Sequence, residues 1–412
     1  MRVTTLLKKI LGIKSLVVEK FETVNGVLVI HVRPRCRKRR CSRCGRIRSG
    51  FNRLDLRYWR HLDFGGIAVY LAYRPRRVNC PSCGIVVEKV PWSEDPRSRF
   101  TTDFEESVGY LVQRCDKTSV TEVFQIAWRT VGTILERVCR RHGSKDPLEG
   151  LVNIGVDEVS YRKGHRYLTL VSNHATGRII WAKEGKGART LAAFFKDLGP
   201  KRCKAIQLVS MDMSQAYIKA TRQYVPHAQI VFDRFHVQKL VSEALDQTRR
   251  EEWRRQLPIY EEEAKATKGM RWALLKNPWN LTAVQSQQLS DLQRENKRLY
   301  RAYLLKESFA AILDRRQPNV AREHLEDWLS WASRSRLSSF VKAARTIRTH
   351  MQDIMAYVRF RMTNAVAEGL NNKVRLLTRR AYGFHSAEAV IAMVMLCCTG
   401  IQLTPVFKIL NL

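Results

Sequence analysis

The stretch that decides the fold is LVNIGVDEVSYRKGHRYLTLVSNHATGRIIWAKEGK, residues 151–186. Hydrophobic and polar residues alternate in three short runs, and turn signals at Lys163-Gly164 and Thr176-Gly177 separate these runs. The pattern predicts three β-strands. Further along, ARTLAAFFKDLG and MSQAYIKATRQYV predict helices, whereas CKAIQLVSMD and HAQIVFDRFHV predict strands. We therefore expect an α/β layer fold in the middle of the chain.

Acidic residues follow these predicted strands. Asp157 is expected at the end of the first strand core, Asp212 at the end of the fourth strand and Asp233 at the end of the fifth. Carboxylates that come together repel one another, and divalent cations relieve that repulsion. The residues therefore predict a pair of Mg²⁺ (or Mn²⁺) ions that can support phosphoryl transfer, with Asp212 or Asp233 as the second ligand. Glu158 is expected on the opposite strand face, and His236 can pair with Asp233 on a helix.

A single acid, Glu368, stands in the basic segment TNAVAEGLNNKVRLLTRRAYGF, residues 363–384. We expect it to be the third carboxylate of the metal site. Asn364, Asn372 and Arg375 lie near Glu368 by helical spacing, which predicts a polar strip facing phosphate. The apolar segment AVIAMVML that follows is expected to close the sheet. The predicted DNA contacts in this region are Asn372, Lys373, Arg375, Arg379 and Arg380.

The charge of the chain predicts a polyanionic partner. The 412 residues include 73 Lys and Arg against 38 Asp and Glu, a net charge of +35 that solubility alone does not explain. The longest apolar run, residues 389–398, is far shorter than the roughly 18 residues of a membrane span, so a membrane partner is not expected. The N-terminus shows no secretory signal, which predicts a cytoplasmic protein associated with the nucleoid.

Two C-x-x-C-G motifs predict a structural zinc site. CSRCG contains Cys41 and Cys44, and NCPSCG contains Cys80 and Cys83. Four thiolates from two such turns complete a tetrahedron around Zn²⁺. The alternatives are four ordinary buried cysteines, or Cys36 as a ligand in place of Cys41. Between the motifs, GIAVYLAYRPRRV, residues 66–78, predicts a strand.

Basic residues surround the first of these motifs. Residues 33–60 contain twelve Lys or Arg and one acid, a composition typical of a phosphate-binding surface. The alternative is a charged surface that only contacts solvent. The predicted DNA contacts here are Arg37, Lys38, Arg39 and Arg40.

The segment KTSVTEVFQIAWRTVGTILERVCRRH, residues 117–142, predicts a helix-turn-helix. It contains two short amphipathic runs separated by a break of turn length, with Thr118 or Ser119 as the cap of the first helix. The second helix is expected to expose Arg129, Thr133 and Arg137 to DNA. An ordinary helical bundle would show the same pattern.

The chain is expected to contain several domains. Residues 240–357 have a strongly helical composition, which predicts an all-helical insertion into the α/β core. The expected limits are 1–97 for the zinc domain, 98–147 for the helix-turn-helix, 148–239 and 358–412 for the two parts of the core, and 240–357 for the insertion.

With these motifs in place, the sequence resembles the ISL-three family of bacterial insertion-sequence transposases over nearly its whole length. CSRCG and NCPSCG resemble the family's zinc finger, KTSVTEVFQIAWRTVGTIL its helix-turn-helix, and IGVDEVSYRKGHRYLTLV the block with its first catalytic Asp. SMDMSQAYIKA, FDRFHV and NAVAEGLNNKVRLLTRRAYGF resemble the remaining blocks of its catalytic domain.

The resemblance implies a ribonuclease H-like core with a helical insertion and a catalytic triad of Asp157, Asp212 and Glu368. Asp233 and His236 then match an accessory D-x-x-H motif, which favours Asp212 as the metal ligand. The implied partners are double-stranded transposon ends and target DNA, bound by a homodimer or a higher oligomer. Two other functions fit the residues: a non-catalytic DNA-binding regulator derived from a transposase, and a structure-selective nuclease.

Overall fold

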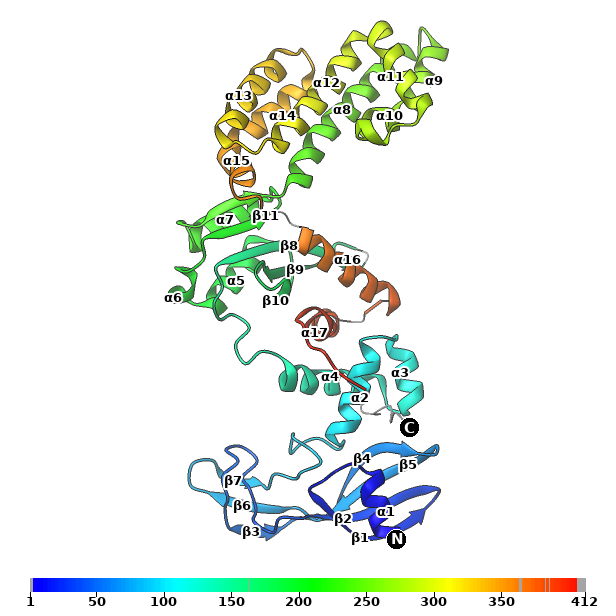
Figure 1. The fold of residues 1–412 in the computed structure, drawn as a ribbon, viewed down its shortest axis with the longest axis vertical. Coiled ribbons are helices and arrows are strands. Elements are labelled where there is room, and N and C mark those ends of the chain that lie inside the picture. Colours follow the sequence, from blue (N-terminus) through cyan, green and yellow to red (C-terminus); the bar gives the residue numbers. More distant parts are fainter. Residues whose placement is uncertain (1–2, 163, 363–364, 382, 385, 406–412) are drawn as a thin grey trace. The chain divides into compact units, whose positions relative to one another are not determined.

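The computed structural model describes residues 3–162, 164–362, 365–381, 383–384 and 386–405. The chain divides into two compact units, residues 1–145 with 377–412 and residues 146–376 (Figure 1). Lys163 of the predicted turn and Asn364 of the predicted polar strip lie outside the described residues. Within the described ranges, no helix combines the length and the apolar character that crossing a membrane requires.

The first unit begins with two small β-sheets. The four-stranded sheet has the order β1-β2-β5-β4, and the three-stranded sheet has the order β3-β6-β7. Trp59 and Trp92 are buried against the larger sheet with their rings edge to face, 5.6 Å apart. The prediction of one strand over residues 66–78 is wrong, because the chain changes sheets at Pro75, which has no N–H to continue a ladder. The elements are α1 (Val3–Ile10), β1 (Leu16–Val24), β2 (Val27–Pro34), β3 (Gly50–Arg53), β4 (Arg57–Phe64), β5 (Ile67–Tyr73), β6 (Arg76–Cys80) and β7 (Gly84–Val87).

Four helices complete this unit: α2 (Thr102–Val112), α3 (Lys117–Phe124), α4 (Trp128–His142) and α17 (Ala387–Cys398). The apolar faces of α2, α3 and α4 pack on one another, and Phe104 of α2 contacts Phe124 of α3 with ring centres 5.1 Å apart. Helix α17 packs on α4. The sequence predicts that this apolar segment closes the central sheet. In the structure it packs on α4.

The second unit contains the predicted α/β layer. Its five-stranded sheet has the order β10-β9-β8-β11-β12, in which β8, β9 and β10 are antiparallel and β11 and β12 run parallel to β8. Phe194, Phe195, Tyr217 and Phe232 are buried in its core. The elements are β8 (Asn153–Arg162), β9 (Arg166–Asn173), β10 (Arg178–Glu184), α5 (Ala188–Leu198), α6 (Pro200–Cys203), β11 (Leu208–Met211), α7 (Gln215–Tyr224) and β12 (Gln229–Phe232).

Helices alone follow β12 in the described chain up to α15, as the composition of this region predicts. Trp328 anchors their core: it is buried, contacts Phe309, and donates a hydrogen bond from its indole nitrogen to the Leu305 carbonyl at 2.8 Å. Trp272 and Trp279 are exposed instead. The elements are α8 (Arg234–Gln256), α9 (Glu261–Gly269), α10 (Arg271–Leu275), a 3₁₀ turn (Pro278–Asn280), α11 (Ala283–Glu295), α12 (Lys297–Asp314), α13 (Pro318–Arg334), α14 (Ser338–Thr349) and α15 (Met351–Phe360), before α16 (Ala365–Arg380).

Candidate functional site

The parallel strands of the central sheet bring three acidic positions to one level. The register of β8 and β11 pairs Gly155 with Ser210, so Asp157 stands beside Asp212 two residues further on. The pairing of β11 with β12 continues in the same register, so Asp233 lies beside Asp212, one strand further from Asp157. Neighbouring strands are about 4.8 Å apart, and equivalent positions on parallel strands face the same side. Asp157 lies in the middle of β8 rather than at its end, because β8 continues its pairing with β9 beyond this level.

Both carboxylate oxygens of Asp157 accept hydrogen bonds. The backbone N–H of Glu158 donates to Oδ1 and the side-chain amide of Asn371 donates to Oδ2, each at 2.7 Å. Burial raises the pKa of Asp157 and the charge of Asp212 raises it further, whereas the two hydrogen bonds oppose this shift. Asp212 accepts a hydrogen bond from the Ser214 N–H at 3.0 Å. The two side chains are therefore held in place in a setting that a cation would stabilise.

Helix α16 carries Glu368 beside this pair. Asn371, the residue that binds Asp157, is buried and follows Glu368 by three positions, which places both residues on one side of the helix. Glu368 itself is exposed. In the described part of the chain, the carboxylate oxygens of Asp157, Asp212 and Glu368 do not all lie within 4.8 Å of one another. The structure thus brings two of the three predicted acids together and puts the helix of the third next to them (Figure 1).

Sequence reasoning missed Asn371. It selected Asn364 and Asn372 by their nearness to Glu368, and Asn372 is exposed. The signal that could have found Asn371 is its spacing of three residues from the lone carboxylate. Only the fold shows that this helix face meets Asp157.

Asp233 and His236 pair as predicted. His236 lies in the first turn of α8, and its Nδ1 is 3.0 Å from Asp233 Oδ2. This hydrogen bond raises the pKa of His236, and the charges of Asp233, Asp212 and Asp157 add to the shift against the effect of burial. The carboxylate of Asp233 is thus already engaged by its own helix.

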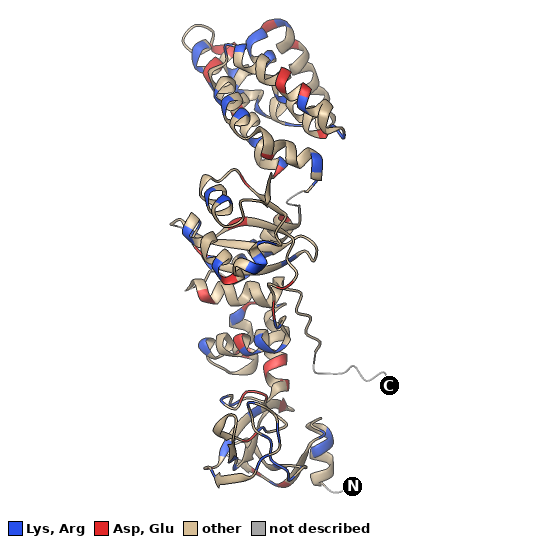
Figure 2. Ribbon diagram, turned by 90° about the vertical axis from the view of Figure 1, so that its left-hand side faces the viewer, with Lys and Arg blue, Asp and Glu red and all other residues tan. Residues whose placement is uncertain are grey.

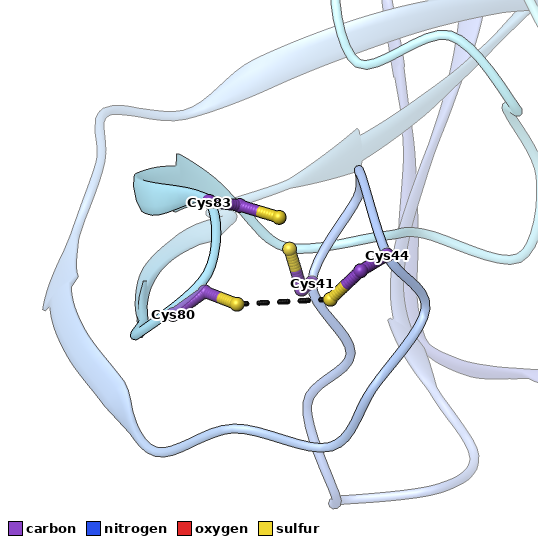
Figure 3. Close-up of side chains that lie close together, drawn as sticks. All are labelled: Cys41, Cys44, Cys80 and Cys83. Carbon is purple, nitrogen blue, oxygen red and sulfur yellow. Dashed lines mark hydrogen bonds between the residues drawn. The ribbon is translucent and has the colours of Figure 1, made fainter.

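The four predicted cysteines form one cluster. The sulfur atoms of Cys41, Cys44, Cys80 and Cys83 all lie within 4.8 Å of one another, and the Sγ atoms of Cys44 and Cys80 are 3.6 Å apart (Figure 3). A Zn–S bond of about 2.3 Å puts the sulfurs of a tetrahedral site about 3.8 Å apart, so the cluster fits Zn²⁺. Cys36 is exposed and lies outside the cluster, which excludes it as the substitute for Cys41.

Glycine and arginine shape the cysteine cluster. Gly45 and Gly84 end the two C-x-x-C turns with φ of 70° and 73°, a conformation that other residues adopt at a cost. The guanidinium of Arg48 donates from Nε to Cys80 Sγ at 3.5 Å and lowers the pKa of that thiol to about 6. The thiolate form, which binds zinc, is therefore favoured at Cys80, whereas burial and the neighbouring thiols raise the pKa of Cys83 to about 12.

Helices α3 and α4 form the predicted helix-turn-helix. Asp116 caps α3 by accepting from the Ser119 N–H at 2.9 Å, so the prediction of Thr118 or Ser119 as the cap is wrong. Gln125 adopts a left-handed conformation, φ 49°, and ends the helix. On α4, Arg129 and Thr133 are exposed as predicted.

Arg137 is not on the exposed face of α4. Its Nε donates to Glu105 of α2 at 2.6 Å, and Arg141 donates to the other oxygen of Glu105 at 2.7 Å. Ser98 also donates to Glu105, which is 1% exposed. The predicted exposure of Arg137 is wrong because a buried carboxylate, which the sequence pattern did not reveal, requires this cation.

We expect Glu105→Gln to destabilise the helix-turn-helix by about 3 kcal/mol, because the half-buried guanidinium of Arg137 loses its counter-charge, whereas Arg141 keeps the carboxylates of Glu94 and Glu106. Amide hydrogen exchange in α2 and α4 measures the effect. Glu136→Gln, an exposed change on α4, is the control. Equal protection in the two variants would show that Glu105 does not hold the helices together.

The other predicted DNA contacts divide into two groups. Arg380 donates to the carbonyl oxygens of Val112 and Gln113 at the end of α2, at 2.8 and 3.2 Å, so its predicted role on phosphate is replaced by capping. Arg39 is half-buried. The residues whose side chains are exposed are Arg37, Lys38, Arg40, Asn372, Lys373, Arg375 and Arg379.

Comparison with known proteins gives two family matches and several relatives. The family described as "Transposase" matches residues 154–394, and "Helix-turn-helix domain of transposase family ISL3" matches residues 88–139. A "Transposase for insertion sequence element IS1557" from Mycobacterium tuberculosis is 39% identical over 97% of this chain and 96% of its own. A "Transposase for insertion sequence element IS1001" from Bordetella parapertussis is 28% identical over 90% of this chain and 91% of its own.

Proposed function

The chain belongs to transposase family ISL3, the ISL-three family named above, and from this premise we propose that Asp157, Asp212 and Glu368 cut and join DNA at the ends of its insertion sequence. It is a DNA transposase. The single observation that carries the assignment of residues is the hydrogen bond from Asn371 to Asp157, because it joins the helix of Glu368 to the strand pair that holds the two aspartates.

A ribonuclease H-like core is supported by the order of the central sheet. Three antiparallel strands are followed by two strands parallel to the first, with the helices α5 and α7 in the connections. The helical insertion then separates β12 from α16. In this arrangement the acids on β8, after β11 and on α16 come from three distant segments, as the resemblance implies.

The acidic residues fit a pair of Mg²⁺ or Mn²⁺ ions. The donors are hard carboxylate oxygens. Burial, and to a smaller extent the charge of Asp212, raises the pKa of Asp157, and a cation would stabilise the ionised carboxylate against both effects. Bound by Asp157, Asp212 and Glu368, such ions would help to activate a water or a 3′-hydroxyl and would stabilise the charge that develops during an in-line phosphoryl transfer.

The protein groups have distinct tasks in this scheme. Asp157 would be shared by the metal site, since its strand is next to that of Asp212 and it binds Asn371 of the helix that carries Glu368, and its two hydrogen bonds fix the plane of its carboxylate. Asp212 is preferred to Asp233 as the second ligand, because its strand is next to β8 and Asp233 is engaged by His236. Lys373, Arg375 and Arg379 on α16 would hold the phosphates of the strand that is cut.

DNA recognition is assigned to the amino-terminal modules. The zinc domain, residues 1–97, and the helix-turn-helix, residues 98–147, would bind the terminal inverted repeats, with Arg129 and Thr133 of α4 directed at DNA. The core, predicted as residues 148–239 and 358–412, would carry out cutting and joining. Residues 377–412 of its second part belong to the same compact unit as the helix-turn-helix, so the catalytic part of that segment is residues 358–376. Because two ends must be brought together, we propose that at least a homodimer acts on the DNA.

We expect Asn371→Ala to lower the rate of strand cleavage about 10- to 100-fold, because Asp157 loses the donor that orients it. The same hydrogen bond lowers the pKa of Asp157. In the variant this pKa rises. The loss of activity on acidification should therefore begin at a higher pH than in the wild-type chain. The pH–rate profile and the Mg²⁺ concentration for half-maximal rate measure this.

The control for Asn371→Ala is Leu376→Ala, an exposed position on the same helix. A purely structural role for Asn371 predicts a lower melting temperature with an unchanged pH profile. That outcome would remove Asn371 from the site.

Strand cleavage and joining on duplexes with the terminal repeats, in Mg²⁺ and in EDTA, tests the proposed function. The non-catalytic regulator predicts specific binding without cleavage under either condition. The structure-selective nuclease predicts that junctions of any sequence are cut. The exposed face of α4 and the cysteine module favour the transposase, since a nuclease of that kind has no need of a sequence reader.

A further inference from the structure

The amino-terminal unit contains a groove of about 770 Å³ that is lined by residues from both of its β-sheets. Lys and Arg occur in every part of the chain (Figure 2), but here arginines converge on one concave surface. Two glutamates, Glu19 and Glu88, also line the groove, so positive charge dominates it. The six arginines are Arg33, Arg37, Arg39, Arg53, Arg74 and Arg76.

Two of these arginines oppose each other across a strand pair. Arg53 at the end of β3 pairs directly with Arg76 at the start of β6, and Arg74 precedes β6 by two residues. Like charges in directly opposite positions destabilise an antiparallel pair. Among the described residues, none of the three has an acidic side chain within ion-pair distance. The arrangement is unfavourable in the free protein and becomes favourable when an anion lies between them.

The Nε atom of Arg39, a residue that lines the groove, lacks a hydrogen-bond acceptor in the described chain. This atom is buried, and the nearest carboxylate oxygen, of Glu88, is 3.9 Å away, too far for a hydrogen bond. Glu88 is 3% exposed and is already engaged by the Tyr73 hydroxyl at 3.0 Å and the Arg76 N–H at 2.7 Å. The chain thus fixes a guanidinium donor whose acceptor is missing.

The backbone of β3 makes room for this side chain. A Cβ on Gly50 would lie 3.2 Å from Cδ of Arg39, so the arginine lies directly against the glycine. With Gly50 on one side and Glu88 on the other, Arg39 has little freedom. A donor that is fixed before binding loses little conformational entropy when an acceptor arrives.

We infer that this groove binds the sugar-phosphate backbone of one strand of the DNA end, and this inference rests on the proposed function. The planar fork of an arginine matches two phosphate oxygens. Glu19 lies 3.1 Å from Arg33 and Glu88 lies 3.9 Å from Arg39, but the other four arginines have no ion-pair partner among the described residues, and four forks along one groove exceed what a single phosphate can use. The groove supplies donors for phosphate oxygens rather than an element that enters a DNA groove. It therefore positions the duplex, while the exposed face of α4 reads bases.

The test is binding of the full-length, zinc-loaded chain to labelled duplexes over a range of salt concentrations. Arg53→Gln/Arg74→Gln removes two groove cations, and Lys9→Gln/Lys20→Gln removes two exposed cations outside the groove. Each lost phosphate contact reduces the slope of log K against log salt by about 0.9, so the groove variant should lose about 1.8. Its affinity should fall by the same factor, about tenfold or more, for a terminal-repeat duplex and for an unrelated duplex.

The control pair should keep a slope close to that of the wild-type chain. Equal slopes for the groove variant and the control pair would overturn the inference, and so would a loss confined to the terminal-repeat duplex, since that indicates base reading. Zinc content and melting temperature check folding. If the double variant loses zinc, the single change Arg74→Gln, in the connection between β5 and β6, should lower the slope by about 0.9.

Cleavage in Mg²⁺ on the same preparations separates this inference from the proposed function. Suppose that the wild-type chain binds with a steep salt dependence but never cuts, and that the groove variant loses this salt dependence. That result would defeat the catalytic proposal and support the groove. A wild-type chain that cuts, together with a groove variant that binds as tightly as wild type, would defeat the groove alone.

Discussion

Asp157→Asn, Asp212→Asn and Glu368→Gln are each expected to lower the rate of DNA strand cleavage about 1,000-fold or more while DNA binding stays within a few-fold of the wild-type affinity. Each change removes one charged oxygen ligand from the proposed metal site without changing the volume of the side chain. A thousandfold loss corresponds to about 4 kcal/mol of transition-state stabilisation, a magnitude found when a group that stabilises developing charge is removed.

The three variants should resemble one another because they act on one site. Combining two of them should cost little more than either alone, as happens for residues that work as a unit. Glu388→Gln, an exposed acid at the start of α17, is the control and should cut at the wild-type rate. If one of the three variants retained most of its activity, that residue would not be a metal ligand, and Asp233 would be the next candidate.

Cys41→Ser is expected to abolish zinc binding and to disorder the three-stranded sheet that contains β6 and β7. The apparent binding free energy of a structural zinc site is about 10–16 kcal/mol, and it becomes folding free energy when the site does not exist in the unfolded chain. This small sheet has a core of few residues, Cys41, Val78 and Cys80, so little else stabilises it. DNA affinity should therefore fall more than tenfold.

Cys36→Ser is the matched control for this change. Cys36 is five residues upstream and lies outside the cysteine cluster, so its variant should keep one zinc ion per chain. Because Cys36 also lines the arginine groove, this control applies to zinc content and not to DNA affinity. Metal analysis of the purified chain and fluorescence anisotropy measure the two properties. A Cys41→Ser chain with full zinc content would mean that the four cysteines are ordinary buried thiols.

The central sheet could be predicted from sequence because its strands carry local signals. Residues 151–186 alternate and contain two glycine turns, and β8, β9 and β10 appear where this pattern puts them. The sequence could not predict that Asp157 and Asp212 lie side by side on neighbouring strands. Asp157 and Asp212 are adjacent because β11 pairs with β8 in a particular register, and a strand's register depends on the tertiary packing of the whole layer.

Charged residues were the hardest to place from sequence. Arg137 and Arg380 lie in sequence segments as basic as those of Arg129 and Arg379. In the structure, however, Glu105 binds Arg137, and a carbonyl group at the end of α2 binds Arg380. Helical periodicity shows which residues share a face but not what that face contacts. For the same reason Asn371 was missed, since its partner is on a strand far away in the chain.

The most direct test of the triad is strand cleavage and joining by the wild-type chain and by Glu368→Gln, on labelled duplexes that carry the terminal repeats of the insertion sequence, in Mg²⁺ and in EDTA. We expect the wild-type chain to cut at the boundary of the element and join the ends in Mg²⁺ only, and the variant to bind the same duplex without cutting it. Cleavage by the variant at the wild-type rate would contradict the assignment of Glu368. Specific binding without cleavage by the wild-type chain, whatever the metal, would favour the regulator.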